Sequence, residues 1–132
     1  MDKEKKDFKG VDLTGVDLTG VNLKDANLTD ANLIGASLAD TTLRFTNLRR
    51  ADLYRADLTD ATFGRANLSH AYLWMANLEK ANLVHANLSE ANLRRANLEN
   101  ARLTYANLEG ANLVGAKFDE NTKWPEGIGV IN

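Results

Sequence analysis

The sequence predicts an all-β fold, a β-helix in which the chain coils around a column of leucine side chains. Leucine or phenylalanine occupies every fifth position from Phe8 to Phe118, in 23 consecutive pentapeptides without an insertion or deletion. A small or β-branched residue stands two positions before every centre except Phe8, and it is alanine in 17 of the 23 units. The middle position between the two is Asn or Asp in 17 of the 23 units. A strict short repeat over most of a chain dictates its architecture more firmly than local propensity does.

A period of five residues excludes both an α-helix and a straight strand. On an α-helix, five residues advance by roughly 500°, so successive leucines would spread around all sides. In a straight strand, successive leucines would alternate between opposite faces. Within one unit, such as Ala76-Asn77-Leu78-Glu79-Lys80, the alanine and leucine can point inward and the Asn outward. The last two residues must then turn the chain, and a corner of the same sense in every unit generates a coil that climbs as a solenoid.

Two local expectations follow from this arrangement. All 23 leucine and phenylalanine centres should be buried in the column. Glycine at the second corner position should favour type II turns, because that position requires a positive φ. Glycine occupies it in six units: Gly10, Gly15, Gly20, Gly35, Gly110 and Gly115.

The tandem Ala-(Asn/Asp)-Leu-x-x units resemble those of the pentapeptide repeat proteins, and residues 6–120 keep their register throughout. The resemblance implies a right-handed quadrilateral β-helix, with four pentapeptides in each coil. About six coils would then form a rod roughly 29 Å tall at a strand spacing of ~4.8 Å. The departures are mild: Lys6 begins the register, and valine or threonine replaces alanine at Val11, Val16, Val21, Thr41 and Thr46.

We expect one domain in three parts. Residues 1–5 are expected to be disordered or a short N-terminal cap, residues 6–120 to form the β-helix of 23 repeats, and residues 121–132 to form a C-terminal cap or tail. Open coil ends expose unpaired backbone groups, so a cap would guard against association. In the tail, Trp124 and Ile128 are expected to cover the last leucines.

The tail also bears on oligomeric state. Its Thr-x-Trp-Pro-x-Gly sequence resembles the end of other pentapeptide repeat proteins, some of which dimerise through a C-terminal helix. Pro125, Gly127 and Gly129 disfavour such a helix here. The sequence therefore predicts a monomer.

Composition narrows the functional classes. A net charge of −2 is too small to direct the protein to nucleic acid or a membrane. The absence of cysteine excludes thiolate chemistry and disulfides. The first residues are charged and lack the apolar stretch of a secretory signal, and no segment approaches the ~20 apolar residues of a membrane span. We expect a cytoplasmic protein of bacterial, and in view of the family's abundance there cyanobacterial, origin.

The repeats offer no site for catalysis. Their carboxylates occupy outward positions of a convex rod, whereas general acid–base chemistry needs a desolvated pair in a pocket. His70 and His85 are the only histidines, and they stand at corners on adjacent sides. The repeat places no further metal-ligating side chain next to them. We therefore expect no enzyme, no cofactor and no metal.

If every fourth unit stacks on the one before it, the outer surface is not uniform. We define the aromatic–arginine face as the candidate protein-binding site, and it comprises Tyr54, Arg55, Tyr72, Trp74, Met75, Arg94 and Arg95. An acidic face adjoins it, with Asp40, Asp57, Asp60, Glu79, Glu99 and Asp119. The opposite face is a second, weaker arginine–aromatic surface, with Arg44, Phe45, Arg65, Val84, Arg102 and Tyr105. Between units, the stacked Asn and Asp side chains are expected to hydrogen-bond from rung to rung.

The aromatic–arginine face has two interpretations. Tyr54, Trp74 and Arg94 could stack on one another and stabilise neighbouring coils through aromatic and cation–π contacts. Exposed Trp, Tyr, Met and Arg together are also typical of binding hot spots.

Three functions are considered for such a rod. The first is a rigid, non-catalytic scaffold or regulator for an unknown protein partner. The second is a DNA mimic that binds DNA gyrase or another nucleic-acid enzyme, by resemblance to quinolone-resistance pentapeptide proteins. That role calls for a long, dimeric, strongly acidic rod, which this chain does not match. The third, ice binding, needs a regular threonine lattice, and the threonines here are scattered. Direct binding to nucleic acid is not expected.

Overall fold

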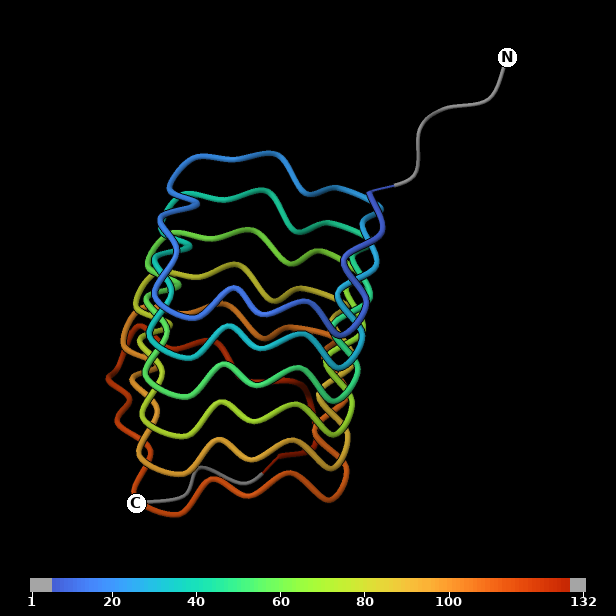
Figure 1. Cartoon of the computed structure of the whole chain (residues 1–132). Helices are drawn as coiled ribbons and strands as arrows, with labels where there is room; N and C mark the ends of the chain where they lie inside the picture. Colours follow the sequence, from blue (N-terminus) through green and yellow to red (C-terminus); the bar gives the residue numbers. More distant parts are fainter. Residues whose placement is uncertain (1–5, 129–132) are drawn as a thin grey trace.

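The computed structural model describes residues 6–128, so the expectations for residues 1–5 and for Gly129 lie outside the described residues. Over the described range the chain winds as a coil, and successive coils stack in the order of the sequence (Figure 1). A parallel bridge connects Asp7 to Asn27, the middle residue of the fourth unit after it, and the same step recurs as far as Asn97 and Lys117. Each coil therefore contains four pentapeptides. No helix occurs between residues 6 and 128.

The extended segments are too short to form longer strands, because a corner follows every centre. Only the middle residue of each unit forms a β-bridge, as an isolated pair with the residue one coil away. We number the sides of the coil 1 to 4, beginning with the units centred on Phe8, Leu13, Leu18 and Leu23. Each later unit lies on the same side as the unit four before it.

Backbone hydrogen bonds join the coils at the centre and at the corner of each unit. On side 1, the Leu48 N–H donates to the Asn67 carbonyl at 2.7 Å, and the Arg50 N–H donates to the Ser69 carbonyl at 3.1 Å. Across the corner, the N–H of Ala51, the first residue of the next unit, donates to the Leu48 carbonyl at 2.9 Å and closes a turn. In the interior coils, the N–H groups of the centre and of the second corner residue are therefore paired with the neighbouring coil.

The second corner residue of every unit from Gly10 to Gly115 has a positive φ. The six glycines predicted there have φ between 65° and 73°, which confirms the predicted positive φ and is consistent with type II turns. Sixteen other residues adopt the same left-handed conformation, with φ between 56° and 64°. This conformation costs an L-residue about 1–2 kcal/mol. The N–H of the same corner residue donates a hydrogen bond to a carbonyl of the next coil, and this bond offsets part of that cost.

The middle Asn or Asp has a local role that the sequence did not predict. In all 17 units that carry Asn or Asp there, the side-chain Oδ1 accepts the N–H of the first corner residue, as Asn77 does from Glu79 at 3.0 Å. That N–H takes no part in the bonds between coils, so the side chain satisfies it. The expected rung-to-rung ladder is wrong as a general feature. Side-chain amides bond between coils only at Asn97–Asn77 and Asn27–Asp7 in the described chain.

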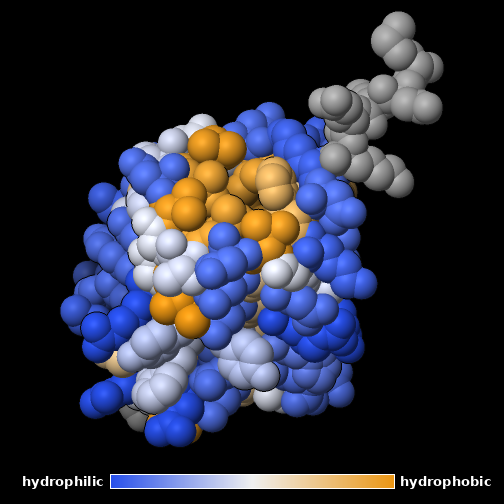
Figure 2. Space-filling model, viewed as in Figure 1, coloured by the Kyte–Doolittle hydropathy of each residue, from blue (hydrophilic) through white to orange (hydrophobic). Residues whose placement is uncertain are grey.

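The core is a column of centres flanked by small residues. Every centre from Leu23 to Leu103 is buried, and Phe63 is fully inaccessible. The expectation that all centres are buried is wrong at both ends, because an end coil has a neighbour on one side only. Figure 2 shows an apolar patch at the end of the stack where the described chain begins. The half-buried centres are Phe8, Leu13, Leu18, Leu108, Leu113 and Phe118.

The C-terminal tail continues the coil after a single inserted residue. Lys123 pairs with Arg102, one position later than the register of the repeats would place the partner. Trp124 therefore takes the place of a centre on side 4, and its ring meets Phe118 edge-on with centroids 5.4 Å apart. The predicted contact of Trp124 with the core is confirmed. Ile128 is half-buried and, among residues 6–128, is not one of the side chains packed on the core.

Candidate functional site

Side 2 departs from the repeat at Tyr72. Six units lack Asn or Asp at the middle position, and on side 2 the only such unit is that of Tyr72. Its side chain is 53% exposed. In the other units of side 2, a side-chain oxygen of the middle residue accepts the N–H of the first corner residue. In this unit the first corner residue is Trp74, and Tyr72 offers its N–H no such oxygen. The fold therefore lacks one corner hydrogen bond at this position.

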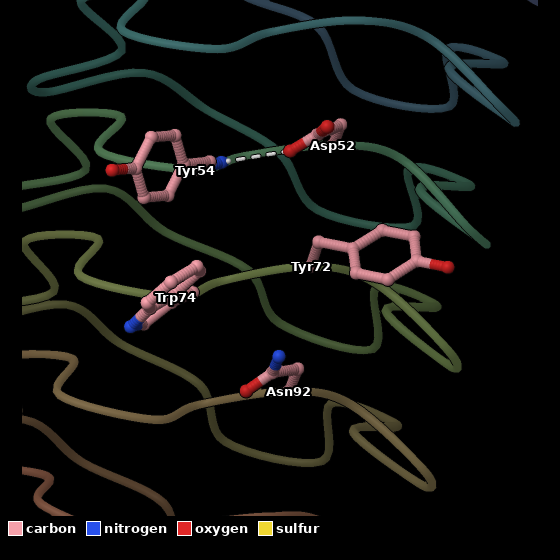
Figure 3. Close-up of a pocket in the computed structure, with 5 residues that line it drawn as sticks. All are labelled: Asp52, Tyr54, Tyr72, Trp74 and Asn92. Carbon is pink, nitrogen blue, oxygen red and sulfur yellow. Dashed lines mark hydrogen bonds between the residues drawn. The ribbon is translucent and has the colours of Figure 1, made fainter.

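Tyr72 lies beside the aromatic pair of the same side. Tyr54 and Trp74 are one coil apart, and their ring centroids are separated by 5.3 Å at an interplanar angle of 46°. Figure 3 shows these two rings one above the other, while the Tyr72 ring extends in the opposite direction across the face. Trp74 is 41% exposed. The structure thus brings together the three aromatic residues that the sequence placed on the aromatic–arginine face.

A shallow hollow of about 250 Å³ lies among these rings. Its remaining lining residues, Asp52 and Asn92, stand one coil before and one coil after Tyr72. The Asp52 Oδ1 accepts the Tyr54 N–H at 3.1 Å, and the Asn92 Oδ1 accepts the Arg94 N–H at 3.1 Å. Figure 3 shows the Asn92 amide nitrogen directed toward the level of the aromatic rings. The hollow therefore has apolar walls with a carboxylate at one end and an amide donor at the other.

The four other predicted residues of the face do not line the hollow. The Arg55 guanidinium lies 5.6 Å from the centre of the Tyr54 ring, which is the cation–π contact of this face. The expected stacking of Arg94 on Trp74 is not found, because Arg94 is exposed and takes part in neither cation–π contact of the described chain. Arg95 is also exposed, and Met75 is half-buried.

The three arginines of this face carry charge that no carboxylate of the described chain neutralises. The ion pairs among residues 6–128 are Arg50–Asp30 and Lys117–Glu99. An aromatic hollow beside unpaired guanidinium groups suits a partner that offers an apolar side chain next to carboxylates.

The sequence did not single out Asp52 and Asn92. Both follow the repeat, so neither stands out as an exception. The sequence did hold one signal that could have identified them. They stand four units before and four units after Tyr72, so they lie directly beside it in the neighbouring coils.

The histidines lie elsewhere. His85 stacks on Tyr105 with ring centroids 4.8 Å apart, and His70 is exposed. The described part of the chain contains no group of three side chains placed to hold a metal ion. It also contains no helix that could cross a membrane.

Comparison with protein families identifies the repeat. A model of pentapeptide repeats matches the chain in eight copies, over residues 7–44, 26–65, 36–74, 46–83, 61–100 and 81–119. A comparison with curated proteins finds no match.

Solved structures are also similar. Rfr23, a pentapeptide repeat protein from the cyanobacterium Cyanothece 51142, is 34% identical over 86% of this chain and 90% of its own, with a TM-score of 0.83. HetL, a pentapeptide repeat protein involved in heterocyst differentiation regulation in Nostoc sp. strain PCC 7120, is 33% identical over 92% of this chain and 65% of its own, with a TM-score of 0.49. QnrB1, a plasmid-mediated fluoroquinolone resistance protein, is 21% identical over 83% of this chain and 78% of its own, with a TM-score of 0.42. The last similarity is too low to support an inference about function.

Proposed function

Because the chain belongs to the pentapeptide repeat family, we propose that it is a non-catalytic scaffold whose aromatic–arginine face binds a protein partner. We take its full architecture to be a right-handed quadrilateral β-helix of about six coils, a rigid stack in which each coil contacts its neighbours. We take its working form to be a cytoplasmic monomer. The bridging step of four pentapeptides and the likeness to Rfr23 support the architecture.

The observation that carries the binding site is Tyr72. Its side chain replaces a residue that would have completed a corner, and it is held in solvent next to Tyr54 and Trp74. Aromatic side chains in a hollow, with arginines around them, are typical anchors of protein interfaces. The unpaired Arg55, Arg94 and Arg95 favour an acidic partner surface.

The test is affinity capture with the purified protein, comparing wild type with Tyr72→Asn. Asn restores the oxygen for the Trp74 N–H, so the variant should fold at least as well as wild type while the hollow loses a wall. A partner held by this face should then be lost while the melting temperature is unchanged or higher.

A matched control is Arg102→Asn on side 4, which restores the same corner oxygen away from the proposed site. It should retain the partner. If Tyr72→Asn binds the partner as well as wild type does, the aromatic–arginine face is a stacking device and the proposal is wrong. A triple variant, Tyr54→Ser, Trp74→Ser and Arg94→Glu, leaves every inward residue in place and should also lose the partner.

The alternative is a DNA mimic that binds DNA gyrase or another nucleic-acid enzyme. The net charge of −2 and the eight arginines between Arg44 and Arg102 do not favour it. Protection of gyrase from a quinolone in a supercoiling assay, retained by Tyr72→Asn, would support the mimic over the scaffold.

A further inference from the structure

A second hollow, of about 480 Å³, lies on side 4, which does not adjoin the aromatic–arginine face of side 2. Its cationic and ring donors are Arg44, Arg65 and His85. Its other polar donors are Thr42, Thr62 and Asn82. No lining residue is a carboxylate. The hollow is thus surrounded by hydrogen-bond donors without an internal counter-charge.

The arginines of this hollow are free to meet an external anion. Neither Arg44 nor Arg65 takes part in the ion pairs found between residues 6 and 128. The Arg44 guanidinium lies 5.9 Å from the centre of the Phe45 ring, which places it against an apolar surface. Guanidinium groups bind phosphate and carboxylate through paired N–H donors.

The backbone of the same two units lacks an acceptor that other units have. Threonine replaces Asn or Asp at Thr42 and Thr62, and neither supplies the oxygen that the other corners place on the first corner N–H. The N–H groups of Arg44 and Gly64 therefore donate to no acceptor in the described chain. Unpaired backbone N–H groups are strong donors and form anion-binding concavities where they converge.

Gly64 keeps the hollow open, although the backbone does not require glycine there. Its φ is not left-handed, and a Cβ built on it would meet its nearest neighbours, atoms of Arg44, at 3.7 Å. A methyl group would fit there and would lie against the Arg44 side chain, which lines the hollow. Glycine without a conformational need costs stability, so its presence here is explained by the space that it leaves.

We propose that the side-4 hollow binds a phosphate group. Successive coils are about 4.8 Å apart, so two oxygens of one phosphate can accept the N–H groups of Arg44 and Gly64. These oxygens act as the acceptors that Asn or Asp Oδ1 supplies in other units. The Arg44 and Arg65 guanidinium groups neutralise the charge, and the Thr42 hydroxyl adds a donor, whereas the Thr62 hydroxyl donates to the Thr41 carbonyl at 3.4 Å. This site is independent of the proposed scaffold function.

The test is a ¹H–¹⁵N NMR titration of the full chain with inorganic phosphate and, separately, with O-phosphoserine, at ionic strength held constant with chloride. The amides of Arg44 and Gly64 should shift in a saturable manner. Tighter binding of phosphoserine would identify a phosphorylated side chain or ester as the source, whereas equal binding would identify the free ion.

The decisive variant is Thr42→Asn with Thr62→Asn, which supplies internal oxygens to both N–H groups and leaves both arginines in place. It should fold as well as wild type and bind phosphate at least tenfold more weakly. Arg44→Gln with Arg65→Gln should weaken binding to a similar degree. Arg94→Gln with Arg95→Gln removes the same charge from side 2 and should leave binding unchanged.

Two results would overturn the proposal. One is the absence of a saturable shift at Gly64 with either probe. The other is equal binding by wild type and the double Thr→Asn variant, since that would show that phosphate contacts the arginines alone and not the corner N–H groups.

Discussion

The side-chain oxygen of the middle residue completes each corner of this chain. Asn or Asp at this position holds the N–H of the first corner residue, so it sets the geometry of the turn that follows each leucine. The same bond explains why threonine, tyrosine or arginine at that position is informative. Such a residue leaves one N–H without its usual acceptor and frees its own side chain for another contact.

Replacing Asn77 by alanine should lower the free energy of unfolding by about 0.5–1.5 kcal/mol, the net value of one hydrogen bond. Tyr72→Asn adds such a bond and should raise it by a similar amount. Urea unfolding followed by circular dichroism measures both. Equal stability of wild type and Asn77→Ala would show that solvent replaces the side-chain oxygen without cost.

The corner is the element that makes a five-residue period possible, and its second residue is held in a left-handed conformation in 22 successive units. Glycine is used at six of them, and the other sixteen bear the cost of a side chain. A corner is therefore a costly element on its own. It persists because the bonds between coils and the buried leucines on either side hold it.

Two glycines distinguish these effects. Gly20 has φ +73° with nothing within 4 Å of a built Cβ, so Gly20→Ala should destabilise the protein by about 1–2 kcal/mol through the backbone alone. Gly64→Ala meets no such restriction and should stabilise it by about 0.4–1 kcal/mol by restricting the unfolded chain. Chemical unfolding of the pair checks both signs, and a loss of stability in both variants would contradict the account of Gly64.

The corner with the inserted residue depends on Asp119. Its carboxylate accepts the N–H of Asn100 at 3.1 Å and that of Asn121 at 3.0 Å. These bonds, chiefly the one from Asn100, together with the Thr122 hydroxyl, lower the pKa of Asp119 below its ordinary value of 3.8. Because the folded pKa is the lower one, this stabilisation is complete above the unfolded pKa and is lost as the pH falls through the folded pKa.

Asp119→Ala should therefore melt at a lower temperature than wild type at pH 7. The difference should shrink below about pH 4 and disappear once Asp119 is protonated in both states. Glu120→Gln removes a charge from the same corner without removing these bonds and should show no such pH-dependent deficit. A deficit of Asp119→Ala that is constant down to pH 2 would contradict the role of the carboxylate.

At the scale of the whole molecule, stability is expected to be lowest at the two ends. Interior centres are inaccessible, whereas Leu13 at one end and Leu113 at the other are half-buried. At the C-terminal end the ring of Trp124 packs on Phe118 and adds one further side to the stack.

Deleting residues 121–132 should expose the last coil and promote end-to-end association, because an uncovered backbone edge can pair with another chain. Sedimentation velocity should show oligomers of the truncated chain where the full chain sediments as a monomer, and its melting temperature should fall. A truncated chain that stays monomeric and equally stable would show that the tail is not a cap. Trp124→Ala in the full chain removes the ring and keeps the backbone of the tail, so it separates the effect of losing the ring from the effect of losing the tail backbone.

The repeat made the coil, its inner column and the conformation of the glycine corners predictable, because each is a consequence of what recurs at every fifth residue. It could not show the exposure of Leu13 or Leu113, since these residues match the pattern and differ only in lacking a neighbouring coil. The inserted residue before Thr122 was visible in the sequence as a break in register. Whether the coil continues after it depended on whether Trp124 could take the place of a leucine centre, which the sequence did not show. The hollow on side 4 escaped prediction because it arises from the missing side chain of Gly64 and from two missing corner oxygens.

The constant step of four units between bonded partners has a consequence for how this chain can change in length. A segment of four whole units could be removed or duplicated with every column above and below it realigned, so that the rod would only become shorter or taller. A single residue gained between positions 54 and 62 would instead lengthen that step, and if it were not accommodated locally, as the residue before Thr122 is, it would separate Tyr54 from Trp74 and Thr42 from Thr62. The insertion found among residues 6–128 lies near the end of the stack, where Lys123 still pairs with Arg102.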